Sequence, residues 1–145
     1  MAKMTLQGVA KRNKETIFLL EPNFGKRVSR WLIECNKLQL QILIYSGFRS
    51  IAEQTKLHND YLAGKIGGPV AAPGNSYHNY GLAVDYVPLM LTKFGYQLAW
   101  GDREGYLKAQ KIGLNHQLTP INGEMAHIQD ARFKTFADIP KGLIK

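Results

Sequence analysis

The chain has 145 residues, the length of one domain, and its composition of 45% hydrophobic and 21% charged residues excludes a disordered or fibrous protein. A single cysteine excludes an internal disulfide framework and a zinc site built from paired cysteines. The apolar runs are much shorter than the roughly 20 residues that cross a bilayer. Residues 1–10 contain no apolar segment of the kind found in secretory signals. We therefore expect one domain over residues 1–145, with no signal peptide, no transmembrane segment and no appended binding domain.

The formal net charge of +8 comes from the two ends of the chain. Residues 1–37 hold eight Lys or Arg against three Asp or Glu, residues 131–145 hold four against one, and the middle is balanced. Basic ends of this kind favour the binding of polyanions, although the same excess of positive charge also increases solubility. A nucleic-acid-binding module would show a denser basic cluster with interleaved aromatic residues and would bind DNA in a salt-sensitive way. We expect no nucleic-acid partner.

Two elements are predicted in the first third of the chain. Residues 24–38 place apolar side chains at steps of three and four, with Arg27 among the charged positions off that face, which predicts an amphipathic helix. Cys35 lies on the apolar face and is expected to be a small buried hydrophobe. Residues 41–45 are rich in β-formers and end at a Ser-Gly pair, which predicts a buried strand.

A capped helix and a long loop follow. Ser50 and Glu53 have the spacing of a capping box, which predicts a helix over 51–63 that Gly64 ends. Residues 64–75 contain six glycines and prolines, a composition that no regular element tolerates. A loop of this length inside one domain is often functional.

The remaining elements are short. Gly81–Val87 alternates and is rich in β-branched residues, which predicts a strand that Pro88 halts. Residues 103–113 are predicted to form a helix and residues 124–129 a final strand. No regular βαβ rhythm and no glycine fingerprint is present. We therefore predict a small α+β domain with a mostly antiparallel sheet and flanking helices.

Two of the four histidines carry no chemical prediction. His58 lies among polar neighbours in the predicted helix and is expected to be exposed to solvent. His116 follows a glycine in a loop without an obvious carboxylate companion, so we assign it no role.

The other two histidines combine with an unusual aspartate. Asp85 lies in the middle of an apolar strand, where burying a lone carboxylate is costly, so it needs a cation, a metal or several donors. His78 lies seven residues before it, and His127 lies in another apolar segment. Two imidazoles and a carboxylate make a three-ligand zinc site of the catalytic kind, with the fourth position left for water. From spacing alone, Asp85 as a turn cap and the two histidines as satisfied core residues stay an equal alternative.

Peptide hydrolysis at such a site requires two further groups. The metal lowers the pKa of its bound water to about 7. A second carboxylate must take the proton and pass it to the leaving amine, and Glu124 is the free carboxylate nearest a candidate ligand. A cation must face the developing oxyanion, and Arg49, after the strand predicted over 41–45, is the best placed.

Three segments resemble the motifs of one family. Residues 76–85 match SxHxxGxAxD at every fixed position, which is the signature of the zinc peptidases grouped with D-alanyl-D-alanine carboxypeptidases and bacteriophage L-alanyl-D-glutamate endolysins. The sequence SGFRS at 46–50, followed by Gln54, resembles the SGYRS-x-x-x-Q segment of that family. Residues 124–127 resemble its D/E-x-x-H motif. The segments occur in family order.

This resemblance implies a fold and a set of roles. The family fold is a small α+β domain whose antiparallel sheet cradles one zinc ion. The matching positions are His78, Asp85 and His127 as zinc ligands, Glu124 as catalytic acid and base, Arg49 as stabiliser of the substrate carbonyl in the transition state, Ser76 and Gly81 as supports of the ligand turn, and Gln54 as a structural or substrate-facing residue.

Two features depart from the family pattern. Family members commonly have proline before the last zinc histidine and a tryptophan several residues upstream of the acid. Here Ala126 takes the first place, and Trp100 lies too far upstream for the second. Glu124 stands where many endolysins of this type have aspartate. These differences leave the cleavage site open.

The resemblance implies a zinc-dependent peptidoglycan hydrolase that acts on the stem peptide. We expect a monomeric L-alanyl-D-glutamate endopeptidase acting as a phage endolysin, made in the host cytoplasm, released to the periplasm and wall, and held on the anionic envelope by its basic ends without a separate cell-wall-binding domain. One alternative is a D-alanyl-D-alanine carboxypeptidase of the same group. Another is a non-catalytic, zinc-stabilised wall-binding domain, which would need neither Glu124 nor Arg49.

Overall fold

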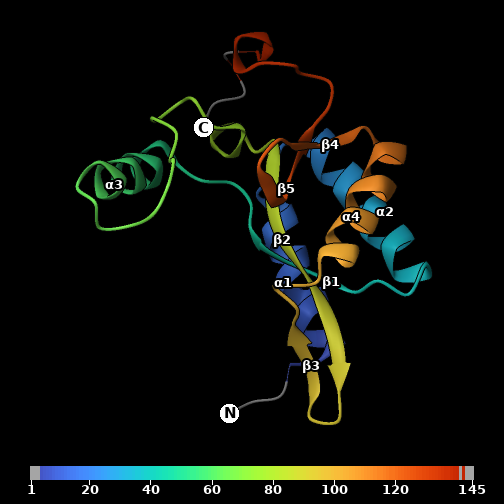
Figure 1. The fold of residues 1–145 in the computed structure, drawn as a ribbon. Helices are drawn as coiled ribbons and strands as arrows, with labels where there is room; N and C mark the ends of the chain where they lie inside the picture. The colour runs from blue at the N-terminus through green and yellow to red at the C-terminus, as the bar shows by residue number, and fades with distance from the viewer. Residues whose placement is uncertain (1–3, 141, 143–145) are drawn as a thin grey trace.

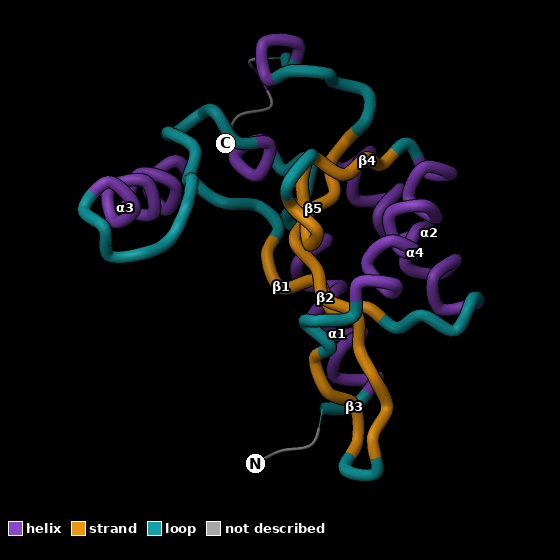
Figure 2. The backbone as a smooth tube through the Cα atoms, viewed as in Figure 1, coloured by secondary structure: helices purple, strands orange, loops and turns teal. Residues whose placement is uncertain are grey.

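An antiparallel sheet forms the centre of the molecule, as Figure 1 and Figure 2 show. The structure, a computed structural model, describes residues 4–140 and 142. Within this part of the chain the sheet has five strands: β1 (Ile42–Ser46), β2 (Ala83–Thr92), β3 (Gly95–Leu98), β4 (Leu118–Ile121) and β5 (Glu124–Asp130). Their order is β1-β2-β5-β4, and β3 pairs with the far end of β2. The predicted α+β architecture with an antiparallel sheet is confirmed.

The helices surround this sheet unequally. They are α1 (Leu6–Phe18), α2 (Pro22–Lys37), α3 (Ile51–Leu62) and α4 (Arg103–Gly113), with short 3-10 turns at Tyr77–Tyr80, Leu114–His116 and Phe136–Asp138. The pair α2 and α4 lies on one side of the sheet, whereas α3 and the loop after it extend to the opposite side (Figure 1). None of the described helices combines the length and the apolar composition needed to cross a membrane.

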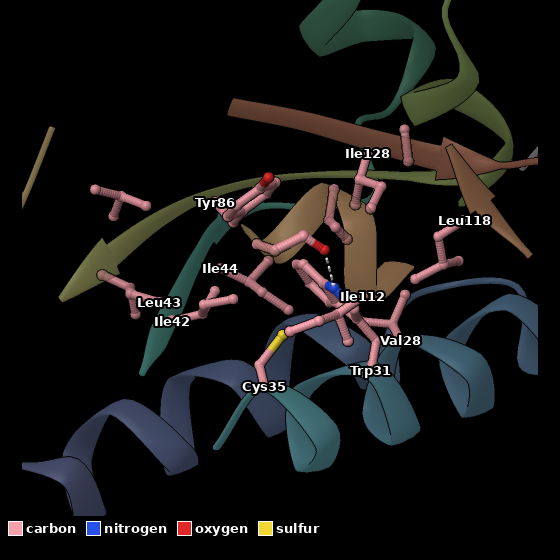
Figure 3. Packing of buried hydrophobic residues seen from close by; sticks show 14 of the residues in the cluster. Val28, Trp31, Cys35, Ile42, Leu43, Ile44, Tyr86, Ile112, Leu118 and Ile128 are labelled. Atoms are coloured by element: carbon pink, nitrogen blue, oxygen red, sulfur yellow. Dashed lines mark hydrogen bonds between the residues drawn. The ribbon is translucent and has the colours of Figure 1, made fainter. Parts of the chain in front are cut away.

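The buried core lies between α2, α4 and the sheet (Figure 3). Trp31 of α2 is fully buried, donates a hydrogen bond of 2.8 Å from its indole nitrogen to the carbonyl of Ala109, and meets the ring of Tyr86 edge-on at 5.1 Å. Cys35 is buried beside it, as predicted, and burial raises the pKa of its thiol to about 12. Arg27 departs from the prediction because it is buried, although it lies off the apolar face of α2.

Five predicted elements appear close to their expected bounds: α2, β1, α3, α4 and β5. The capping box at the start of α3 forms in both directions, between Ser50 and Glu53. The loop over 64–75 contains no helix or strand. The sequence therefore predicts these elements because each carries its own local pattern.

The prediction missed α1 because its inward face contains an asparagine. Asn13 is buried, its amide nitrogen donates to the carbonyl of Ile42 at 2.9 Å, and its amide oxygen accepts from the nitrogen of Ile44 at 2.8 Å. This side chain thus pairs with the edge of β1 as a neighbouring strand would. A polar residue at that position interrupts the apolar period on which helix prediction depends.

The prediction that Pro88 halts its strand is wrong, because β2 continues to Thr92. The carbonyl of Pro88 accepts from Ala99, and the next nitrogen, that of Leu89, donates to Gln41 on the other side. The proline nitrogen therefore points to the side of β2 where the pairing with β5, which spans 83–85, has already ended. On this side Pro88 faces Ala99, and the one bond that proline cannot donate is the bond to the carbonyl of Ala99. That carbonyl accepts from the nitrogen of Asp102 at 3.0 Å instead, so proline is tolerated there.

Candidate metal centre

Three sequence-predicted residues meet at one end of the sheet. His78 comes from the 3-10 turn before β2, Asp85 from β2 and His127 from β5. Asp85 and His127 are directly paired across the two antiparallel strands. One candidate ligand atom from each of the three side chains lies within 4.8 Å of the others. The arrangement can therefore hold one metal ion.

The turn that carries His78 is shaped by its two flanking residues. The Ser76 hydroxyl accepts a hydrogen bond of 3.3 Å from the backbone nitrogen of His78. Gly81 ends the turn with a φ of 69°, and a Cβ there would lie 2.8 Å from the nitrogen of Glu21. A side chain at position 81 would therefore be both strained and in collision with the start of α2.

Each histidine uses one ring nitrogen to fix its orientation. His78 Nδ1 lies 2.8 Å from the carbonyl oxygen of Gly47, and His127 Nε2 lies 2.9 Å from Oε1 of Gln129. The other nitrogens, His78 Nε2 and His127 Nδ1, lie 3.3 and 3.1 Å from Oδ1 of Asp85. Partners of this kind set the tautomer and orientation of metal-binding histidines. Sequence analysis missed Gln129, although it lies two residues after His127, on the same face of the strand.

These distances fit a zinc ion. A tetrahedral zinc with bonds of about 2.0–2.1 Å separates its ligand atoms by roughly 3.3 Å. The separations between the Asp85 oxygen and the two imidazole nitrogens are close to that value. The donor set of two imidazoles and one carboxylate is also the set that zinc takes in catalytic sites.

The charges in the cluster depend on one another. Burial alone would raise the pKa of Asp85, but hydrogen bonds from His127 and His78 outweigh it and hold this pKa well below its usual range. Burial would lower the pKa of His127, yet its hydrogen bonds to Asp85 and Gln129 raise it overall. Asp85 is therefore ionised at neutral pH and requires positive charge beside it.

Arg49 reaches the cluster from the segment between β1 and α3. Its Nη2 lies 3.9 Å from Oδ2 of Asp85, and its Nη1 donates to Oε1 of Gln54 at 2.9 Å. Gln54 is 1% exposed and donates from its own amide to the carbonyl of Ala71 at 2.7 Å. Gln54 thus ties the guanidinium to both α3 and the long loop.

Asn79, which sequence analysis did not single out, also holds the segment that carries Arg49. It is fully buried, donates from its amide nitrogen to the carbonyl of Arg49 at 2.9 Å, and accepts from the nitrogen of Gly74 at 3.0 Å. Its position is one of the variable letters of the SxHxxGxAxD pattern, so no local signal marks it.

Glu124 begins β5 at the open side of the cluster. Its Oε2 lies 3.5 Å from Nδ1 of His127, and its side chain is 55% exposed. This carboxylate is therefore accessible to water while it faces a candidate ligand. It is therefore a second carboxylate beside the cluster, at the position where the sequence predicted one.

A cleft of about 460 Å³ surrounds these groups. The cluster and Glu124 form one side, and α3 with the loop after it forms the other, through Leu57 and residues 69–71. The loop predicted to be functional therefore borders the metal centre.

The two remaining histidines differ from their predictions. His58 is half-buried, not exposed, and its Nδ1 lies 2.9 Å from the carbonyl of Val70, which ties α3 to the loop. His116 does have a carboxylate companion, because its Nε2 lies 2.6 Å from Oε1 of Glu34. That partner is on α2, far away in the sequence.

Comparison with known proteins gives one family and a group of similar folds. The model of the VanY family, described as D-alanyl-D-alanine carboxypeptidase, matches residues 18–117. This match includes His78, Asp85 and Arg49 and ends before Glu124 and His127. No curated protein sequence matches the chain significantly.

Three solved structures share the fold at low sequence identity. A mutant of the vancomycin resistance D,D-pentapeptidase VanY in complex with Zn(II) is 17% identical, with a TM-score of 0.59 over 77% of this chain and 72% of its own. VanYB in complex with D-alanine-D-alanine is 17% identical, with a TM-score of 0.61 over 77% and 71%. The L-Ala D-Glu endopeptidase ChiX of Serratia marcescens is 18% identical, with a TM-score of 0.57 over 89% and 90%. Carboxypeptidase and endopeptidase folds are thus both similar to this chain.

Proposed function

Since this chain belongs to the VanY family of D-alanyl-D-alanine carboxypeptidases, whose structural neighbours include a zinc complex, we propose that it is a zinc-dependent peptidoglycan hydrolase that cuts the L-alanyl-D-glutamate bond of the stem peptide. His78, Asp85 and His127 hold the metal in this proposal, since their spacing and donor types fit zinc. Bound zinc supplies a water of lowered pKa and polarises the scissile carbonyl.

The residues of the chain supply the proton transfer and the oxyanion contact. Glu124 takes the proton of the attacking water and gives it to the leaving amine, because its carboxylate faces the cluster and is open to the cleft. Arg49 presents its guanidinium to the carbonyl oxygen as negative charge develops there. Gln54 is a positioning residue that holds Arg49 through a hydrogen bond of 2.9 Å.

The charged residues that line the cleft favour an endopeptidase over a carboxypeptidase. Among the described residues that line the cleft, Arg49 is the one lysine or arginine. A carboxypeptidase needs a cation for the free carboxylate of its substrate as well as one for the oxyanion. A single guanidinium serves one of these purposes, and an endopeptidase needs only the second. The likeness to ChiX, which covers nearly the whole of both chains, supports the same choice at the level of the fold.

The D-alanyl-D-alanine carboxypeptidase is the second candidate. The family description and the likeness to VanYB in complex with D-alanine-D-alanine favour it. In that case Arg49 would bind the terminal carboxylate, and the oxyanion would depend on the metal alone.

We propose lysis of a bacterial host as the biological role, with release from the host cytoplasm to the wall. Lys11, Arg12 and Lys14 are exposed on α1 and offer a basic patch to the anionic envelope. Lys3, Lys141 and Lys145 lie outside the described residues. Binding to sacculi that does not weaken as salt rises would contradict this electrostatic attachment.

Digestion of Gram-negative-type sacculi, with mass spectrometry of the products, tests the activity. The wild-type protein should release peptides with a new N-terminal D-glutamate. Glu124→Ala should slow this release by about 10²–10⁴-fold, because it removes the acid and base but no metal ligand. Glu15→Ala, an exposed carboxylate on α1, is the matched control and should keep full activity.

Each other outcome has a distinct meaning. Release of free D-alanine would identify the carboxypeptidase. If the zinc-loaded wild-type protein releases no product, the non-catalytic wall-binding domain would be the remaining alternative. Full activity of Glu124→Ala would remove Glu124 from the mechanism.

A further inference from the structure

Tyr45 and Trp100 form an exposed aromatic shelf beside the metal centre. Their ring centroids lie 5.2 Å apart with the planes at 66°, and the two residues are 41% and 55% exposed. The other tryptophan, Trp31, is fully buried in the core. Two large rings packed on each other and left open to solvent are typical of a binding surface.

The shelf adjoins the residues assigned to catalysis. Tyr45 precedes Ser46, which is paired with Asp85 across β1 and β2. Burial, followed by the negative charge of Asp85 and smaller contributions from Tyr106 and Glu124, raises the pKa of Tyr45 to about 12, which agrees with this proximity. Trp100 packs on Tyr45 and lies three residues before the start of α4. Because α4 and α3 lie on opposite sides of the sheet (Figure 1), the shelf extends this surface away from the wall formed by α3 and its loop.

A hollow of about 270 Å³ lies between Trp100, the start of α4 and β5. Trp100 and Arg103 line it together with Met125 and Ala126, the two residues between Glu124 and His127. Among the described residues that line this hollow there is no carboxylate. The hollow therefore offers an aromatic face and a guanidinium with several N–H donors.

This pair of features matches the chemistry of an N-acetylated sugar. A pyranose ring has a flat apolar C–H face, and its edge carries hydroxyl and acetamido oxygens that accept hydrogen bonds. An aromatic ring can pack on the C–H face, and a guanidinium can donate hydrogen bonds to the hydroxyl and acetamido oxygens.

We propose that Tyr45, Trp100 and Arg103 bind the N-acetylated sugar to which the stem peptide is attached. This rests on the proposed L-alanyl-D-glutamate cleavage, in which one residue and a lactyl link separate the scissile carbonyl from the sugar. Each extended residue spans about 3.3–3.6 Å, so the sugar would lie close to the metal centre. In D-alanyl-D-alanine cleavage, three further residues would move the sugar roughly 10 Å farther away. A sugar subsite that adjoins the metal centre therefore deepens the endopeptidase proposal.

The first test measures binding without catalysis. Trp100 is exposed and Trp31 is buried, so a ligand on the shelf should change the emission of one tryptophan. Titration of the zinc-loaded protein with N-acetylmuramyl-L-alanine should give a saturable fluorescence change that Trp100→Phe abolishes. L-alanine amide, which lacks the sugar, is the control ligand. No response to the sugar, or an equal response to both ligands, would overturn the proposal.

The second test compares two substrates of equal peptide sequence. The ratio of kcat/KM for a muramyl tetrapeptide to that for the free tetrapeptide should be about tenfold in the wild-type protein and should fall towards one in Trp100→Ala. Phe94→Ala removes an aromatic ring that is 66% exposed at the turn between β2 and β3, and it should leave the ratio unchanged.

The outcomes of the two tests separate the shelf from the proposed function. Release of D-alanine instead of a D-glutamyl product would contradict the endopeptidase, and the titration would still decide whether the shelf binds sugar. A wild-type ratio near one with the expected D-glutamyl product would contradict the shelf and leave the endopeptidase intact. Circular dichroism of Trp100→Ala confirms that the variant is folded before the ratios are compared.

Discussion

Asp85 in β2 and Asp130 at the end of β5 are carboxylates of the same sheet in different surroundings. Asp130 is fully buried, and two arginines compensate its charge. Arg27 donates to Oδ2 at 2.6 Å, and Arg132 donates to the same oxygen at 2.7 Å and from its backbone nitrogen to Oδ1 at 2.9 Å. Both oxygens of this carboxylate therefore have strong donors.

Asp85 has weaker partners for a charge of the same size. Its Oδ1 faces His78 and His127 at 3.3 and 3.1 Å, and the guanidinium of Arg49 lies 3.9 Å from its Oδ2. Two of these partners are imidazoles. A protonated imidazole competes with a metal ion for the carboxylate of Asp85, whereas a neutral imidazole can bind the same metal ion. The comparison teaches that a carboxylate whose two oxygens both have close arginine donors, as in Asp130, supports the fold. A carboxylate without a permanent cation in close contact, as in Asp85, is suited to bind a metal cation.

Asp130→Asn is expected to have the largest effect on the fold. The substitution leaves the buried Arg27 without its negative partner and leaves Arg132 with Glu21 alone, so the free energy of unfolding should fall by about 3–5 kcal/mol. Urea denaturation should show the same loss with zinc and with a chelator, because the carboxylate of Asp130 is held by Arg27 and Arg132 and not by a candidate metal ligand. Asp60→Asn, which removes an exposed ion pair with Lys56, is the control and should change stability little. A near-neutral Asp130→Asn would contradict the structural role given to this carboxylate.

Asp85→Asn should give the opposite pattern. It removes one of the three proposed metal ligands, so zinc affinity should fall by more than the roughly 100-fold that the loss of a supporting residue can cost, and the proposed hydrolysis should disappear. The fold should survive, since the side chain lies at the wall of a cleft. Isothermal titration with zinc measures the affinity. Retained stoichiometric binding at wild-type affinity would remove Asp85 from the ligand set.

The pH dependence of the metal-free protein sharpens this prediction. The lowered pKa of Asp85 means that its contribution is present above its ordinary value, near 3.9, and is lost as the pH falls through the folded value. The raised pKa of His127 means that its contribution is present below about 6.5 and is lost as the pH rises through the folded value. The stability deficit of metal-free Asp85→Asn should therefore be largest between about pH 4 and 6.5. A deficit that is constant from pH 3 to 9 would show that these two charges are not coupled.

The difference between the two carboxylates also explains what the sequence could predict. Asp85 is an aspartate inside an apolar strand, a local conflict that indicates a special environment. Asp130 ends its strand two residues before Arg132, and in the sequence alone this spacing is typical of an ordinary ion pair on the surface. Its burial depends on Arg27, which is 103 residues away in the sequence, and no local pattern indicates that contact.

The same division applies to the rest of the molecule. Ser50 with Glu53, and the glycine-rich loop, each carry a complete local signal, and the structure confirms both. Asn13 is satisfied in the interior only because β1 supplies its hydrogen-bond partners. Whether β2 can contain a proline at position 88 depends on which neighbouring strand faces the proline nitrogen. Sequence patterns record periodicity and capping, but they do not record which distant group will satisfy a buried polar atom.

Gln129 gives the smallest of these effects and the finest test of the metal centre. Its Oε1 lies 2.9 Å from Nε2 of His127, so it should fix the tautomer that leaves Nδ1 free for the metal. Gln129→Ala should lower zinc affinity by about 10–100-fold. Gln129→Glu keeps an acceptor at the same distance along the side chain and should restore most of that affinity. If Gln129→Ala binds zinc as the wild-type protein does, the cross-strand contact with Asp85 is sufficient to orient His127, and the neutral amide serves only to satisfy a buried N–H group.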